Sequence, residues 1–188
     1  MQEQLAQVPF WYLRHGETDW NRQGLQQGSV DIPLNETGLA QAREAAKLLR
    51  GRGIATIVAS PLSRARVTAE IVAEALGLSV TLEADVREVA WGVEEGRGMA
   101  DWFPHWIAGT ATPEGAESFD TLRRRVVSGL NRAIARPGSV LVVAHGGVFR
   151  AARAAMGVEM SGRTRNCVPM FCAPPPAPGG GWTLTIHD

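Results

Sequence analysis

The chain has little cysteine, little lysine and no long apolar run, and each shortage narrows what the protein can be. Its two cysteines, Cys167 and Cys172, are too few for a disulfide framework and have no neighbouring histidine pair that would suggest a metal site, so we expect two buried thiols. No stretch approaches the ~20 apolar residues of a membrane span, and the N-terminal MQEQLAQVPFWYL lacks the basic start of a secretory signal. We therefore expect a cytoplasmic protein.

Charge of either sign is not in excess. Nineteen basic residues balance nineteen acidic ones, whereas a general binder of nucleic acid or of membrane surfaces needs a basic surplus. Lys47 is the only lysine and the other cations are arginines, a bias that we attribute to a GC-rich coding sequence rather than to phosphate binding. We expect no nucleic acid and no membrane as partners.

Strand-like and helix-like segments alternate along 188 residues, a length that suits a single core. We expect a helix to begin at Ser60-Pro61, with the serine as its N-cap and the proline at its first position. Residues 85–112 are predicted to be irregular. Strands are predicted at 8–13, 54–60, 78–82 and 139–144, helices at 39–50, 60–77 and 119–134, and two further strands around a Pro/Gly-rich loop within 168–188. This order predicts an α/β fold with a mostly parallel sheet covered on both faces.

Polar residues follow three of the predicted core strands. Arg14 and His15 come after FWYL, Arg64 follows the strand that ends in IVAS, and His145 comes after VLVVA. Ligands of such sheets bind beyond the carboxyl ends of the strands, so these four side chains are expected to meet at one edge.

Such a cluster suits an anion. The fork of an arginine side chain matches phosphate oxygens, and a helix that starts at Ser60-Pro61 would add free N–H groups beside Arg64. Gly16, Gly146 and Gly147 would let a bound group approach the backbone closely. With no Walker motif and no carboxylate cage for magnesium, the residues favour metal-free phosphoryl transfer, with a histidine as nucleophile.

A general acid is needed to protonate the leaving oxygen. The loop VREVAWGVEEG, residues 86–96, offers Glu88, Glu94 and Glu95. The residues alone do not choose among these three carboxylates.

The motifs RHGETDWN, SPLSRARVTA, REVAWGVEEG and VVAHGG resemble those of the histidine phosphatase superfamily, which has the phosphoglycerate mutase-like fold. The resemblance extends over nearly the whole chain in the correct order. It implies a three-layer α/β/α sandwich with a mostly parallel central sheet and a single domain over residues 1–188, with a short variable cap at about 97–116. It implies no cofactor and no metal.

The resemblance also implies roles for individual residues. His15 would be the nucleophile that becomes phosphohistidine, and Arg14, Arg64 and His145 would clamp the transferring phosphoryl group. Glu88 matches the acid of the family loop, which settles the choice that the residues leave open. Other positions expected to bind substrate are Asn21, Gln27, Gly28 and Gly146.

Two positions depart from the family pattern, and both concern the wall around the substrate. Ala90 stands where an acidic residue is common, and Glu94-Glu95-Gly96 stands where many relatives carry WEG. True mutases resemble this chain but close their site with longer insertions. The short segment 97–116 therefore favours a phosphatase acting on a small phosphomonoester. The alternatives are mutase-type phosphoryl transfer, a phosphoprotein phosphatase and a non-catalytic phosphate-binding protein.

Specificity is expected from the segment that holds Trp102, Phe103, His105 and Trp106. Four later arginines would add a second anion site if one or two point inward, and are otherwise solvated surface cations. These are Arg150, Arg153, Arg163 and Arg165. The sequence names neither the substrate nor the oligomeric state.

Overall fold

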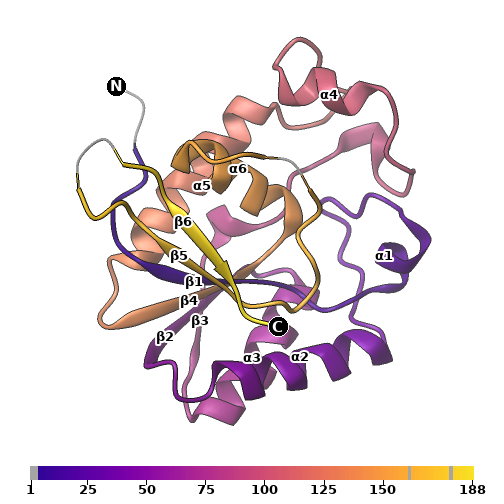
Figure 1. Ribbon diagram of the computed structural model, residues 1–188. Coiled ribbons are helices and arrows are strands. Elements are labelled where there is room, and N and C mark those ends of the chain that lie inside the picture. The colour runs from indigo at the N-terminus through magenta and orange to yellow at the C-terminus, as the bar shows by residue number, and fades with distance from the viewer. Residues whose placement is uncertain (1–3, 161, 178–179) are drawn as a thin grey trace.

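The protein is built around one six-stranded sheet, with the strand order β3-β2-β4-β1-β5-β6 (Figure 1). The computed structural model describes residues 4–160, 162–177 and 180–188, so the first three residues and part of the Pro/Gly-rich loop lie outside the described residues. The strands are β1 (Phe10–Arg14), β2 (Ile54–Ala59), β3 (Val80–Leu82), β4 (Ser139–Ala144), β5 (Met170–Ala173) and β6 (Thr183–Ile186).

The sheet is parallel where the sequence predicts it. Strands β1, β2, β3 and β4 pair in parallel, while β5 and β6 form an antiparallel hairpin beside β1. Strand β4 lies between β2 and β1 and is buried from Val140 to Ala144. Its continuous apolar run is therefore explained by burial on both faces of the sheet.

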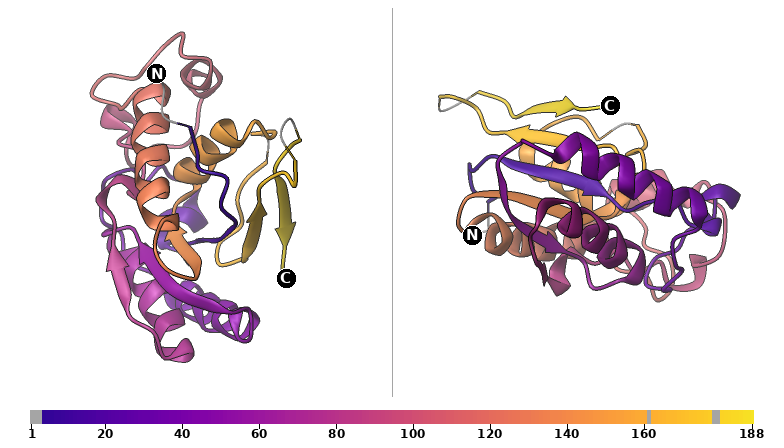
Figure 2. Two further views of the ribbon diagram at one scale, coloured as in Figure 1. Left: turned by 90° about the vertical axis from the view of Figure 1, so that its left-hand side faces the viewer. Right: turned by 90° about the horizontal axis from the view of Figure 1, so that it is seen from below.

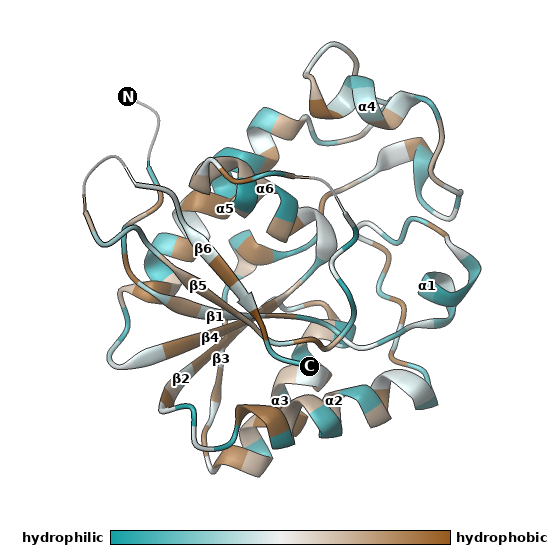
Figure 3. Cartoon of the chain, in the orientation of Figure 1, coloured by the Kyte–Doolittle hydropathy of each residue, from teal (hydrophilic) through white to brown (hydrophobic). Residues whose placement is uncertain are grey.

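Helices cover both faces and produce the three predicted layers. Helices α2 (Glu36–Leu49) and α3 (Ser63–Leu76) lie on one face, and α5 (Phe119–Ile134) and α6 (Gly146–Met156) lie on the other (Figure 2). Because successive strand residues point to opposite faces, Tyr12 packs in the core on the α5 side and Leu13 in the core on the α2 side. The sheet is the most hydrophobic layer (Figure 3).

Three predictions about helices need correction. Helix α3 begins at Ser63 with Leu62 as its N-cap, so the predicted cap at Ser60 is wrong. The stretch 85–112 contains the short helix α4 (Trp102–Ile107), and α6 follows β4 directly; neither was predicted. The remaining short elements are α1 (Asp19–Gln23), η1 (Ala84–Val86) and η2 (Gly92–Glu94).

Both cysteines are buried and unbonded to each other, as predicted. Among the described residues, no helix combines the length and the apolar character needed to cross a membrane.

Candidate active site

The carboxyl ends of β1 and β4 place two histidine rings side by side. His15 directly follows β1 and His145 directly follows β4, and these strands are paired neighbours. The backbone N–H of His15 donates to the carbonyl of Ala144, which continues the pairing by one residue. The two buried rings have their centroids 5.2 Å apart.

The ring of His15 is held in one protonation state. Its Nδ1 lies 2.7 Å from the carbonyl oxygen of Gly16, and because a carbonyl only accepts hydrogen bonds, Nδ1 carries the proton. Burial, together with the positive charges of Arg14 and Arg64, lowers the pKa of His15 well below its ordinary value. The ring is therefore neutral near pH 7, with an unprotonated Nε2.

Ser60 is the partner of the second ring. Its Oγ accepts from the N–H of Leu62 at 3.3 Å and lies 2.7 Å from Nε2 of His145, and its hydroxyl can donate to or accept from that nitrogen according to the ring tautomer. Burial, followed by the charge of Arg64, lowers the pKa of His145 well below its ordinary value. A neutral ring that accepts at Nε2 carries its proton on Nδ1.

Two buried arginines flank the histidines. Arg14 donates from Nη1 to the carbonyl of Thr164 at 2.6 Å, and Arg64 donates to the carbonyls of Val30 and Gly28 at 2.9 and 2.8 Å. Burial and the nearby Arg163 lower the pKa of Arg14 to about 10. Both groups remain cations at neutral pH.

Three buried nitrogens of this cluster have no hydrogen-bond partner within the described chain. They are Nε of Arg14, Nε of Arg64 and Nδ1 of His145. Buried donors without acceptors are rare and costly in folded proteins. Arg14 and His145 lie at the carboxyl ends of β1 and β4, Arg64 lies in α3 after β2, and the charges of both arginines act on His145. Such a set of groups fits an anion with several oxygens, such as a phosphoryl group.

Glu88 faces this cluster from another part of the chain. Its Oε2 accepts from the N–H of Gly147 at 3.2 Å and its Oε1 from its neighbour Val89 at 3.0 Å. A Cβ on Gly147 would lie 2.5 Å from Oε1 of Glu88, so the glycine makes room for the carboxylate. Glu88, Arg14 and His15 line one cavity of about 530 Å³.

The other two candidate acids of the loop are engaged elsewhere. Glu95 accepts from the backbone and the hydroxyl of Ser29 at 2.8 and 2.6 Å, and Glu94 pairs with Arg97 at 3.6 Å. Neither lines the cavity. The geometry therefore favours Glu88 as the group that faces a substrate.

The remaining sequence candidates lie around the same cavity. Its lining includes Asn21, Gln27, Gly28 and Gly146. Sequence reasoning missed Asn166, whose side-chain amide donates to the carbonyl of His15 at 2.7 Å from a segment 151 residues away. Its place after Thr164, outside every recognised motif, gave no signal of this contact.

Two expectations about anion binding are wrong. The first N–H of α3 is not free for a ligand, because Asp31 accepts from both the backbone and the hydroxyl of Ser63 at 2.8 Å. Gly16 makes no room for a ligand either: a Cβ there would collide with the backbone of Gly38 in α2. The glycine is needed for close packing between the first loop and α2.

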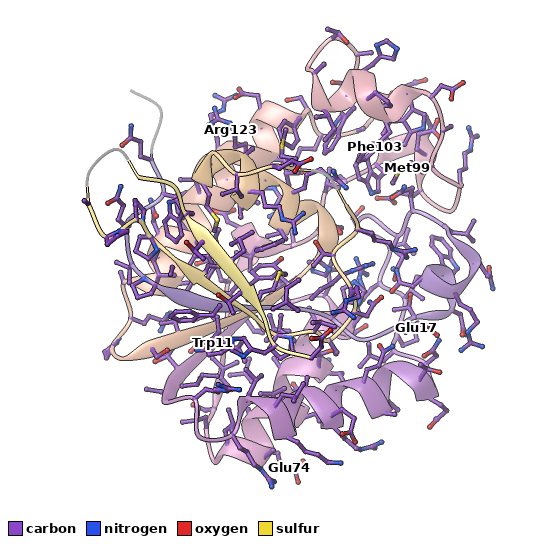
Figure 4. All side chains as sticks on the ribbon, viewed as in Figure 1. Trp11, Glu17, Glu74, Met99, Phe103 and Arg123 are labelled. Atoms are coloured by element: carbon purple, nitrogen blue, oxygen red, sulfur yellow. The ribbon has the colours of Figure 1, made fainter. Side chains whose placement is uncertain are left out.

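The specificity candidates divide into two groups. Phe103 and Trp106 of α4 line the cavity together with Met99, and Figure 4 shows Phe103 and Met99 close together beside α4. Trp102 and His105 are not part of the lining.

The four candidate arginines also divide into two groups. Arg150 and Arg163 line the cavity. Arg153 lies over the ring of Phe149, and Arg165 pairs with Asp188.

Within the part of the chain that the structure describes, no group of three or more histidine, cysteine or acidic side chains could hold a metal ion.

The sequence profile of the histidine phosphatase superfamily (branch 1) matches residues 10–170, a range that contains both histidines, both buried arginines and Glu88. The chain belongs to this superfamily. A relative from Yersinia pestis (strain Pestoides F), named probable phosphoglycerate mutase GpmB, is 36% identical over 72% of this chain and 68% of its own length.

Solved structures of similar proteins agree with the fold. A structure titled mycobacterial hydrolase 1 superposes with a TM-score of 0.81 and 28% identity over 96% of this chain and 97% of its own. A mycobacterial glucosyl-3-phosphoglycerate phosphatase in complex with VO3 superposes with a TM-score of 0.81 and 27% identity over 96% and 99% of the two chains. The predicted phosphoglycerate mutase-like fold is thus confirmed.

Proposed function

We propose that this protein is a metal-independent phosphomonoester hydrolase that acts on a small phosphorylated metabolite through a phosphohistidine at His15. The observation that carries the proposal is the neutral His15 ring, whose proton sits on Nδ1, beside the unsatisfied donors of Arg14, Arg64 and His145. A nucleophile with an available lone pair thus stands next to donors suited to the oxygens of a phosphoryl group.

In the first step, Nε2 of His15 attacks phosphorus and the bond from phosphorus to the ester oxygen breaks. Arg14, Arg64 and Nδ1–H of His145 donate to the phosphoryl oxygens and stabilise the charge on them. The departing alkoxide takes the proton of Glu88, which lines the same cavity. The alcohol leaves, and the phosphoryl group stays on the ring nitrogen.

In the second step, water attacks the phosphohistidine. The Glu88 carboxylate accepts a proton from the water as the new bond between oxygen and phosphorus forms. The bond between phosphorus and Nε2 breaks, inorganic phosphate is released, and His15 and Glu88 return to their starting protonation states.

A mutase is the second candidate, because the Yersinia relative carries that name. Such an enzyme must keep water away from phosphohistidine between two transfers. In this chain the described cap over residues 97–116 holds one six-residue helix, α4. So short a cap favours hydrolysis over retention of the phosphoenzyme.

The test is release of inorganic phosphate from a panel of small phosphomonoesters by the wild type, His15→Ala and His105→Ala. His105 is exposed and lies outside the cavity, so its variant controls for replacement of a histidine. We expect the wild type and His105→Ala to release phosphate at equal rates, with or without EDTA, and His15→Ala to release none. Phosphate release by His15→Ala would refute the nucleophile, and a large loss with EDTA would refute metal independence.

The panel includes 3-phosphoglycerate, with analysis for 2-phosphoglycerate. Interconversion of the two without net release of phosphate would establish the mutase and refute hydrolysis as the main activity.

A further inference from the structure

The cavity extends well beyond the phosphoryl cluster, and one of its walls is apolar. This wall comes from the segment after α1, from residues 91–99 and from α4, and it comprises Leu25, Trp91, Met99, Phe103 and Trp106. Trp106 is fully buried and meets the ring of Trp91 edge to face with ring centroids 4.6 Å apart, so this part of the wall is rigid. Met99 is 56% exposed at the rim and can adapt to different shapes. The wall suits the carbon skeleton of the alcohol that is released.

Two arginines also line this space. Arg150 comes from α6, and Arg163 comes from the segment between α6 and β5. Arg150 donates from Nη1 to the carbonyl of Met160 at 2.7 Å, and its guanidinium lies 5.0 Å from the centroid of the Phe103 ring. These two contacts hold its charged group at the cavity wall instead of letting it extend into water.

Neither arginine has a carboxylate partner among the described residues. Arg165, only two residues beyond Arg163, is paired with Asp188 at 2.5 Å, as is usual for a surface cation. No such pair involves Arg150 or Arg163 within 4–160, 162–177 and 180–188.

The charges of the described cavity lining are out of balance. The lining contains three arginines, Arg14, Arg150 and Arg163, against one carboxylate, Glu88. Burial and then the neighbouring Arg153 lower the pKa of Arg150, and Arg163 is the charge that most lowers the pKa of Arg14. A phosphoryl group held by Arg14 leaves the charges of Arg150 and Arg163 without a counter-charge.

We propose that Arg150 and Arg163 form a subsite for a second anionic group, such as a carboxylate, on the alcohol part of the substrate. The proposal rests on the proposed phosphatase function and narrows its substrate class. The preferred ester carries one further negative charge, and its carbon skeleton lies against Met99 and Phe103. An alcohol with an ammonium group is disfavoured, because it would face two cations.

The test compares kcat/KM for three small esters that differ in the charge of the alcohol. 3-Phosphoglycerate carries a carboxylate, glycerol 3-phosphate carries a neutral hydroxymethyl group in its place, and phosphoethanolamine carries an ammonium group. A charge-assisted hydrogen bond contributes ~1.5–3 kcal/mol, so we expect the carboxylated ester to be preferred over the neutral one by about tenfold or more. The ammonium ester is expected to be the poorest of the three.

In the variants Arg150→Met and Arg163→Gln, the ratio of kcat/KM for the carboxylated ester to kcat/KM for the neutral ester should fall toward one. Arg165→Gln is the matched control, because it removes a neighbouring arginine that is paired outside the cavity. It should keep the wild-type preference. Equal use of the carboxylated and neutral esters by the wild type would overturn the proposal. An equal loss of both rates in the two cavity variants would overturn it as well, because the arginines would then only support the fold.

Binding to His15→Ala, measured by calorimetry, separates this proposal from the phosphatase proposal. This variant lacks the nucleophile, so the intact esters can be compared at equilibrium. Tighter binding of 3-phosphoglycerate than of glycerol 3-phosphate, with no phosphate release by the wild type from any ester, would retain the subsite and refute hydrolysis. Phosphate release without discrimination in rate or binding would retain hydrolysis and refute the subsite.

Discussion

Arg125 of α5 forms a two-bond ion pair with Glu117, with 2.6 Å between Nε and Oε1 and 2.7 Å between Nη2 and Oε2. Both side chains are nearly nine-tenths buried. The same guanidinium donates from Nη1 to the carbonyls of Asp85 and Arg87 at 2.9 and 2.7 Å, and from Nη2 to the carbonyl of Glu88 at 3.1 Å. One side chain therefore holds the loop that carries the proposed acid.

We expect Arg125→Met to impair protonation of the leaving group by displacing Glu88. Hydrolysis of an alkyl phosphate should fall by about tenfold, part of the ~10²–10⁴ that general acid catalysis contributes. Hydrolysis of p-nitrophenyl phosphate should fall much less, because its leaving group needs little protonation. Steady-state kinetics with both esters, below the unfolding temperature, measure the difference.

Arg132→Met is the matched control for this variant. Arg132 lies two turns further along α5 and pairs with Glu83 and Asp85, but its side chain is half exposed and it does not contact Glu88. Its variant should keep the wild-type ratio of the two rates. An equal fall of both rates in Arg125→Met would show that Arg125 supports the fold without positioning the acid.

Ser60→Ala should allow the His145 ring to adopt both of its neutral tautomers. The hydroxyl is the described partner of Nε2, so its removal lets the ring proton move to that nitrogen and leaves Nδ1 unable to donate to phosphate. Loss of one such hydrogen bond, ~1.4 kcal/mol, corresponds to about a tenfold fall in kcat. Nitrogen-15 NMR of the histidine rings should show protonated Nδ1 in the wild type and a mixture in the variant. An unchanged tautomer, with unchanged kcat, would contradict this role.

Stability should decrease as the pH falls below the unfolded-state histidine pKa of about 6.5. Burial lowers the pKa of both His15 and His145 in the folded chain, so between pH 7 and 5.5 the unfolded chain binds protons that the folded chain does not. Each histidine then contributes a slope of up to ~1.4 kcal/mol per pH unit, with stability highest on the alkaline side. Urea unfolding at three pH values measures the slope.

Variants test the assignment of that slope. His15→Gln should remove about half of it, and His105→Gln, which replaces an exposed histidine, should keep it. A wild-type stability that stays constant or rises from pH 7 to 5.5 would contradict the neutral state of the buried rings.

Both cysteines should be unreactive in the folded protein. Burial raises the pKa of Cys167 and of Cys172 to about 12, so almost no thiolate is present at pH 8. A thiol reagent such as DTNB should modify neither residue in native buffer and both in denaturant. Rapid modification of one thiol in native buffer would show that the residues that bury this thiol move apart readily.

The positions of the site residues could be predicted because parallel strands deliver their next residues to one edge. FWYL and VLVVA read as buried strands, so His15 and His145, which follow them, were expected at one edge of the sheet. The structure places the two strands side by side and the two rings 5.2 Å apart. Glu88 required the family resemblance, because local sequence does not distinguish it from the other loop carboxylates. In the structure Glu88 stands out because it lines the cavity and contacts the N–H of Gly147, 59 residues away, whereas Glu94 and Glu95 do not line the cavity.

The errors come from tertiary contacts that override local preferences. Ser60 before a proline is a common N-cap pattern, but its hydroxyl is used by His145, which lies 85 residues away. Helix α6 opens with two glycines, which are poor helix formers, and is stabilised by a buried face that includes Phe149. The role of Arg125 depends on carbonyls 37–40 residues away, which no periodicity in the sequence indicates.

Covalent catalysis by His15 requires a phosphoenzyme, which can be trapped during turnover. Wild type and His15→Ala are mixed with a 32P-labelled ester, quenched in the steady state and digested for peptide mapping. We expect an acid-labile, alkali-stable label on the wild-type peptide that contains His15, and none on the variant. Turnover by the wild type with no label on this histidine, or with the label on another residue, would rule out His15 as the nucleophile.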